Sequence, residues 1–95
     1  MSQVLAEFSI VPVAQGDWKP FMDLAVQELQ RDGLKFEVGA ESTAVEGDLD
    51  QVLNAIKQVH QAVMDKGVDR VITEIRIDEK KGGLSIDEET QGYRA

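Results

Sequence analysis

The order of apolar segments along this chain constrains its fold more than any other feature of the sequence. A strand-like, a helix-like and a second strand-like segment follow one another, and after a short turn the same succession is repeated. The predicted elements are a strand at 4–11, a helix from Asp17 to Gly33, strands at 34–38 and 43–46, a helix from Asp48 to Gly67, and a strand at 71–77. A connection through a helix joins parallel strands, and a tight turn reverses the chain direction. The pattern therefore predicts an α+β fold: a ferredoxin-like βαββαβ sandwich with a four-stranded antiparallel sheet, order 4-1-3-2, and two helices on one face.

The alternation of residues in the predicted strands assigns them to two faces of the sheet. The positions predicted to face the helices are Val4, Ala6, Phe8, Ile10, Leu34, Phe36, Val38, Val45, Val71, Thr73, Ile75 and Ile77. The positions predicted on the second face are Leu5, Glu7, Ser9, Val11, Glu37, Ile72, Glu74 and Arg76. No segment of the sequence is predicted to cover this second face. Large apolar residues among charges on a bare face indicate an interface, so we expect a homo-oligomer.

The length and the composition bound the domain organisation. With 95 residues, the chain has room for one domain, predicted at residues 1–79. From Asp78 onward the composition becomes polar, and residues 80–95 are predicted to be a flexible or partner-ordered tail. Neither a targeting signal nor an apolar stretch long enough for a membrane span is visible, so a soluble, cytoplasmic protein is expected.

Charge and residue types exclude several classes of function. The chain has 18 acidic and 10 basic residues, a net charge of −8, which argues against nucleic acid and against acidic membrane surfaces as partners. A small cationic ligand suits this charge better. The chain has no cysteine and one histidine, which argues against disulfides, iron–sulfur clusters and a metal site, so no cofactor is expected.

Proteins that share this predicted fold carry many different functions, and the sequence excludes some of them. The cysteine clusters of ferredoxins and the Cys-x-x-Cys of copper chaperones are missing. Phe8 and Phe36 face the helices, so the bare face lacks the stacking aromatics of an RNA-binding sheet. The loop after the first strand has no arginine of the kind that an acylphosphatase needs.

Individual residues give weaker indications. His60 lies at the edge of the apolar stripe of the second helix, and we interpret it as a half-buried flanking residue. Trp18, at the start of the first helix, is interpreted as a packing anchor. An enzyme that uses Glu46 together with His60 is the catalytic alternative, and it requires both side chains in one cleft. With no nucleophile in evidence, no enzymatic activity is expected.

Several segments, taken in order, resemble the small thiamine-binding protein family. They are Ala6-Glu7-Phe8-Ser9-Ile10-Val11-Pro12, Gly33-Leu34-Lys35-Phe36, Thr43-Ala44-Val45-Glu46-Gly47-Asp48, His60-Gln61-Ala62-Val63, Arg70-Val71 and Ile75-Arg76-Ile77-Asp78. The resemblance extends from about residue 4 to about residue 80. Glu41-Ser42 departs from the family, whose members tend to have a smaller, more apolar pair there, and Lys80 stands where they tend to have an arginine.

The resemblance implies a ferredoxin-like fold, dimers or tetramers assembled through the sheets, and binding of thiamine or its hydroxymethylpyrimidine moiety without catalysis. Ser9, Thr43 and Glu46 fall within the matching segments and are the predicted ligand contacts. Glu37 is added because of its place on the bare face. A carboxylate would favour the positively charged thiazolium, and hydroxyls would match the aminopyrimidine. The alternative is a regulatory or assembly protein that docks other proteins through the bare face and binds no small ligand.

Overall fold

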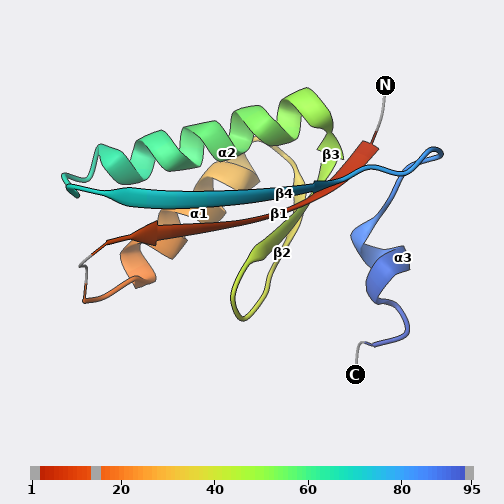
Figure 1. Ribbon diagram of the computed structural model, residues 1–95, viewed down its shortest axis with the longest axis horizontal. Helices are drawn as coiled ribbons and strands as arrows, with labels where there is room; N and C mark the ends of the chain where they lie inside the picture. Colours follow the sequence, from red (N-terminus) through yellow and green to blue (C-terminus); the bar gives the residue numbers. More distant parts are fainter. Residues whose placement is uncertain (1–2, 14–15, 94–95) are drawn as a thin grey trace.

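Four strands and two long helices follow one another in the predicted order, and a short third helix comes after them (Figure 1). The computed structural model describes residues 3–13 and 16–93. The elements are β1 (Gln3–Pro12), α1 (Lys19–Arg31), β2 (Lys35–Val38), β3 (Thr43–Asp48), α2 (Leu49–Met64), β4 (Val71–Asp78) and α3 (Ile86–Thr90). The sheet has the order β2-β3-β1-β4, and all neighbouring strands are antiparallel. The predicted ferredoxin-like topology is therefore confirmed. Within the described ranges, no helix is both long and apolar enough to cross a bilayer.

The hydrophobic core lies between the two inner strands and the two long helices. Alternate residues of β1 point into it, as the sequence pattern predicted. Its buried members are Val4, Ala6, Phe8, Ala25, Leu29, Val45, Val52, Ala55, Ile56 and Val59. Because residues of α1 and α2 meet the same parity of β1, both helices pack on one face of the sheet.

The outer strands are less buried than the alternation predicted. Val38 of β2 is 49% exposed, and Ile75 and Ile77 of β4 are 45% and 39% exposed. These three residues lie on the predicted face of the sheet, but none of them is buried. They lie on the helix side, but the buried core draws its strand residues from β1 and β3. Alternation assigns a residue to a face, whereas its burial depends on how far the helices extend across that face.

The observed ends of the two long helices can be compared with the predicted ones. Gly33, predicted to end the first helix, has a φ of 70°, a left-handed conformation that glycine adopts without strain. The N-cap of α1 is Trp18, whereas the predicted helix begins at Asp17, whose carboxylate accepts the Lys19 N–H at 3.0 Å. Asp48 occupies the N-cap of α2, but its side chain accepts no helical N–H. The two long helices therefore begin at or within two residues of the predicted positions, and neither N-cap side chain forms a capping hydrogen bond.

The C-terminal segment packs on the second face of the sheet at one end. Leu84 and Ile86 are 7% and 1% exposed, and the Ile86 N–H donates to the Glu46 carboxylate at 2.9 Å. Lys35 of β2 forms an ion pair with Asp87 of α3. Figure 1 shows α3 at the end of the molecule opposite the α2–β4 turn. The expectation that nothing covers the second face is therefore wrong at this end, whereas the mobility of residues 80–95 stays a prediction.

Candidate functional site

Strand β1 has two neighbouring strands along only part of its length. β3 pairs with residues 3–8 of β1, whereas β4 pairs with residues 5–12. Pairing with β3 stops at Phe8 and Thr43 because the chain turns away there. The turn between β2 and β3 is closed by a hydrogen bond from Gly39 N–H to the Ser42 carbonyl, 2.9 Å long. The last part of β1, residues 9–12, therefore has one open edge.

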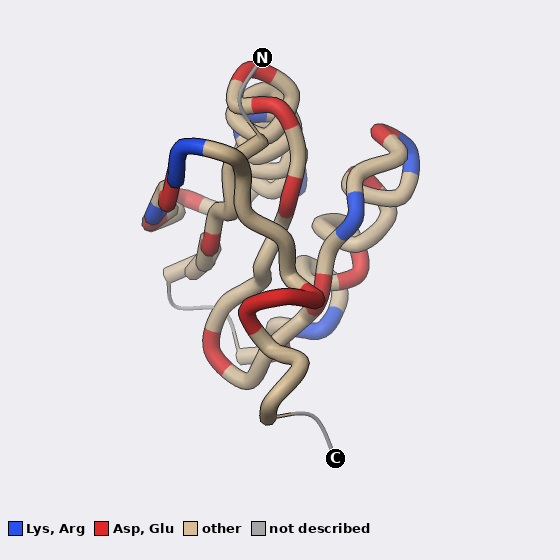
Figure 2. Tube along the Cα trace, turned by 90° about the vertical axis from the view of Figure 1, so that its right-hand side faces the viewer, with Lys and Arg blue, Asp and Glu red and all other residues tan. Residues whose placement is uncertain are grey.

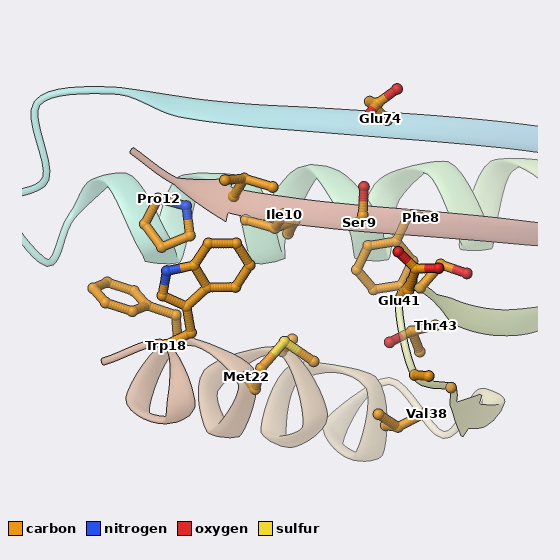
Figure 3. A pocket seen from close by; sticks show the side chains of 16 residues that line it. Phe8, Ser9, Ile10, Pro12, Trp18, Met22, Val38, Glu41, Thr43 and Glu74 are labelled. Atoms are coloured by element: carbon orange, nitrogen blue, oxygen red, sulfur yellow. The ribbon is translucent and has the colours of Figure 1, made fainter. Parts of the chain in front are cut away.

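A cavity of about 590 Å³ lies at this open edge, between β1, the start of α1 and the β2–β3 turn (Figure 3). It is lined by Phe8, Ser9, Ile10, Val11, Pro12, Trp18, Phe21, Met22, Ala25, Val38, Gly39, Ala40, Glu41, Ser42, Thr43 and Glu74. A volume of this order is typical of small-molecule sites, which range from roughly 300 to 1,000 Å³. The cavity is thus large enough to hold a small organic molecule.

One wall of the cavity is apolar and aromatic. Trp18 and Met22 point from α1 toward β1, and Val38 lies at the far end, on the β2 side (Figure 3). Trp18 is 46% exposed, so its indole is only half-buried, and its interpretation as a packing anchor stays a prediction. A half-exposed indole in the wall of a cavity offers a flat surface against which a heteroaromatic ring can stack.

The polar groups of the cavity lie on its opposite sides. Thr43 is only 3% exposed, and its side chain lies on the helix side of the sheet. The side chains of Ser9 and Glu74 point to the side of the sheet that faces away from α1 (Figure 3). Glu41 stands on the turn, whose Ser42 hydroxyl donates to Glu7 at 3.0 Å. No lysine or arginine lines the cavity in the part of the chain that the structure describes.

The structure brings two of the four predicted ligand residues together. Ser9 and Thr43 both line the cavity, whereas Glu37 and Glu46 do not. The Glu46 carboxylate accepts hydrogen bonds from the backbone of α3 and from the side-chain amide of Gln3, the latter at 3.0 Å. Whether any of the four binds a ligand stays a prediction.

The sequence pattern missed the two carboxylates of the cavity as ligand residues. Glu74 had been placed on the bare face together with Ser9, and the two pair across β1 and β4. Glu41 stands in the segment that departs from the family pattern. That departure was the only signal for Glu41, because nothing local predicts that the turn lies beside the end of β1.

Glu46 and His60 cannot form one catalytic site. Glu46 pairs with Leu5 on the face that carries α3, whereas His60 is on α2, across the sheet. The His60 Nδ1 lies 2.6 Å from the Thr73 hydroxyl oxygen, a hydrogen bond between α2 and β4. This geometry removes the catalytic alternative and agrees with a flanking role for His60.

The cavity lining contains two acidic residues, Glu41 and Glu74, and the whole chain has a net charge of −8. Figure 2 shows acidic positions at several places along the trace, including a continuous stretch on α3. Across residues 3–13 and 16–93, no group of three or more histidine, cysteine, aspartate or glutamate side chains could hold a metal ion. The net charge of −8 favours a cationic ligand over an anionic one.

Comparisons with known proteins agree with the resemblance read from the sequence. The model of a family described as thiamine-binding protein matches residues 6–94. UPF0045 protein MJ1052 of Methanocaldococcus jannaschii is 39% identical over 82 residues, covering 85% of this chain and 81% of that protein. UPF0045 protein CPE1503 of Clostridium perfringens is 37% identical over 73 residues, covering 77% of each chain.

Solved structures show the same fold. A domain of unknown function, DUF77, from Bacillus cereus superimposes with a TM-score of 0.87 at 40% identity, covering 98% of this chain and 91% of that one. A protein of Thermotoga maritima, named as a candidate for thiamine biosynthesis or salvage, gives a TM-score of 0.84 at 27% identity, covering 97% of this chain and 99% of that one. On the family match and these likenesses, the chain belongs to the thiamine-binding protein family.

Proposed function

We propose that this protein binds thiamine or its hydroxymethylpyrimidine moiety in the cavity at the open edge of β1, without catalysing a reaction on it. The observation that carries the proposal is the composition of the cavity. An aromatic and apolar wall stands on the α1 side, and two carboxylates stand at the opposite rim. The description of the family names thiamine as the ligand, and the residues that line the cavity suit thiamine.

The chemistry of thiamine matches the two sides of this cavity. Its aminopyrimidine ring is flat and would stack on Trp18, while the Thr43 and Ser9 hydroxyls offer hydrogen bonds to ring substituents. Its thiazolium carries a fixed positive charge, which Glu41 and Glu74 would stabilise at the rim. In this arrangement the carboxylates near the ligand are those of Glu41 and Glu74, and not those of the predicted Glu37 and Glu46.

Substitution of Trp18 tests the proposal. Trp18→Ala removes the stacking surface, and we expect thiamine affinity to fall by about tenfold, because a buried aromatic contact is worth on the order of 1 kcal/mol or more. Isothermal titration calorimetry with thiamine and with free hydroxymethylpyrimidine measures the effect. Tyr93→Ala is the matched control, since Tyr93 is 90% exposed and outside the cavity. A wild-type protein that releases no heat at millimolar ligand contradicts the proposal.

A second candidate function rests on strand β4. This strand is at the edge of the sheet, and Ile72, Ile75 and Ile77 are each about two-fifths exposed, at 42%, 45% and 39%. An exposed apolar edge strand is a template for pairing with another chain. We infer that copies of this chain associate into dimers or tetramers through the sheet. A protein that only assembles with others, without a small ligand, is the alternative that this surface favours.

A further inference from the structure

The ladder of hydrogen bonds in the sheet determines which backbone groups face the cavity. In an antiparallel sheet, the N–H and C=O of one residue point to the same neighbouring strand, and those of the next residue point to the opposite one. Val13 N–H donates to the Arg70 carbonyl at 2.9 Å, in register with the pairing of β1 and β4. The odd-numbered residues of β1 therefore bond to β4, and the even-numbered residues point toward β3.

The β2–β3 hairpin gives the same assignment independently. Gly39 N–H donates to the Ser42 carbonyl, so even-numbered residues of β3 bond to β2 and odd-numbered ones point to β1. The last pair that β1 forms with β3 is thus Phe8 with Thr43. Two residues further along β1, the N–H and C=O of Ile10 point to the same side, where no strand of the described chain pairs with them.

Ile10 is the one residue of this open stretch that presents both a donor and an acceptor. Pro12, the next even-numbered residue, has no N–H and presents a carbonyl alone. Ile10 lines the cavity, and its side chain packs against the core, so its backbone groups lie beside apolar surface. A donor and an acceptor held there without partners are costly unless water or a ligand satisfies them.

We infer that the Ile10 N–H and C=O form hydrogen bonds with the edge of an aminopyrimidine. The ring occupies the position where β3 would pair with β1 if β3 were longer. A ring nitrogen next to an exocyclic amino group offers an acceptor beside a donor, the complement of the N–H and C=O of one extended residue. The ring then lies edge-on to β1, with one face toward the apolar wall of α1. This inference rests on the proposed function and names the contact that selects the pyrimidine part of the ligand.

Amide chemical shifts in the intact protein test the inference without any substitution. In ¹⁵N-labelled protein titrated with 4-amino-5-hydroxymethyl-2-methylpyrimidine, the Ile10 amide signal is expected to move downfield, as donation to a ring nitrogen requires. The Ile75 amide, which points to the outer edge of β4, serves as the internal control and stays in place. Movement of the Trp18 indole signal without movement of Ile10 overturns the inference and leaves the proposed function standing. Absence of any shift at millimolar ligand overturns both.

Two variants at one position separate the backbone from the side chain. Ile10→Pro removes the N–H, and because that N–H lies outside the β1–β4 ladder, proline costs no strand hydrogen bond. Ile10→Ala truncates the side chain and keeps the N–H. We expect Ile10→Pro to bind the pyrimidine about tenfold more weakly than Ile10→Ala, the scale of one lost hydrogen bond. Equal affinities, with circular dichroism showing that both variants fold, overturn the inference.

A change in the ligand tests the carbonyl in the same way. The analogue with a dimethylamino group in place of the 4-amino group has no donor for the Ile10 carbonyl. We expect it to bind the wild-type protein at least tenfold more weakly than the parent pyrimidine. An analogue that binds as tightly as the parent overturns the assignment of the carbonyl as acceptor.

Discussion

Glu41 and Glu74 carry the charge of the cavity although neither was predicted as a ligand residue. Both side chains are exposed, so water weakens their attraction for a ligand, and each contributes modestly. Their combined effect concerns selectivity more than affinity. A neutral pyrimidine is indifferent to them, a thiazolium is attracted, and a phosphate ester of thiamine is repelled.

Removing these two charges is expected to change the affinity for each ligand in a predictable direction. In the double variant Glu41→Gln with Glu74→Gln, we expect thiamine to bind about two- to fivefold more weakly and the neutral pyrimidine to bind as before. We expect the wild-type protein to bind thiamine diphosphate more weakly than thiamine, and the double variant to gain affinity for thiamine diphosphate. Calorimetry at low salt measures all three ligands. Glu79→Gln, beyond the end of β4, is the control, and an equal loss for thiamine and the pyrimidine would contradict the charge argument.

Among the elements, α3 depends on a few polar contacts with the sheet. The Glu46 carboxylate accepts the first N–H of the helix, and the Gln3 amide joins Glu46 to the Leu84 carbonyl at 2.9 Å. Ser85 caps the helix by accepting the Glu88 N–H at 3.1 Å. A helix of five residues cannot persist alone, so these contacts and the burial of Ile86 hold it in place.

Glu46→Ala distinguishes a role in holding α3 from the predicted role in ligand binding. We expect amide hydrogen exchange in residues 84–90 to become about tenfold faster, since hydrogen bonds to a charged acceptor are lost, while the core stays protected. Thiamine affinity is expected to stay within twofold of the wild type. Glu37→Ala, on the same face of the sheet, is the control. A large loss of thiamine affinity in Glu46→Ala would instead support the ligand contact that the family resemblance implied.

The helices and strands of this fold can be predicted from the sequence, whereas the cavity cannot. The parity of β1 predicted Val4, Ala6 and Phe8 in the core because alternation is a property of each strand by itself. The open edge beside Ile10 depends instead on where β3 stops pairing, which is set by the turn after Val38. That relation between distant segments has no local signature, so Ser9 and Thr43 came from a family resemblance and Glu41 was missed.

At the scale of the whole molecule, β4 is the strand through which we propose that copies of the chain associate. Its outer edge pairs with no strand among residues 3–13 and 16–93, and its exposed isoleucines lie on both faces of the sheet. Edge-to-edge pairing and face-to-face packing of two copies would both involve this strand. A two-fold interface presents each residue twice, so one substitution affects two contacts.

Lysine substitutions on β4 test self-association. We expect Ile72→Lys and Ile75→Lys to shift the protein toward monomers, because each places two charges in an apolar interface, and multi-angle light scattering after size exclusion measures the mass. Tyr93→Lys adds the same charge at a residue that is 90% exposed. A wild-type protein that is monomeric at all concentrations rules out the self-association proposed here. If such a monomer is also silent toward thiamine, the assembly alternative gains support.

The β2–β3 turn, which closes one end of the cavity, contributes to the shape of the cavity but not to the hydrophobic core. Ala40 and Glu41 are exposed, and neither of them belongs to the buried core. Changes of length or side chain there would reshape the mouth of the cavity while leaving the packed interior intact. Under the proposed function, the ligand preference of this protein can therefore change through substitutions in one short loop, at little cost to the stability of the fold.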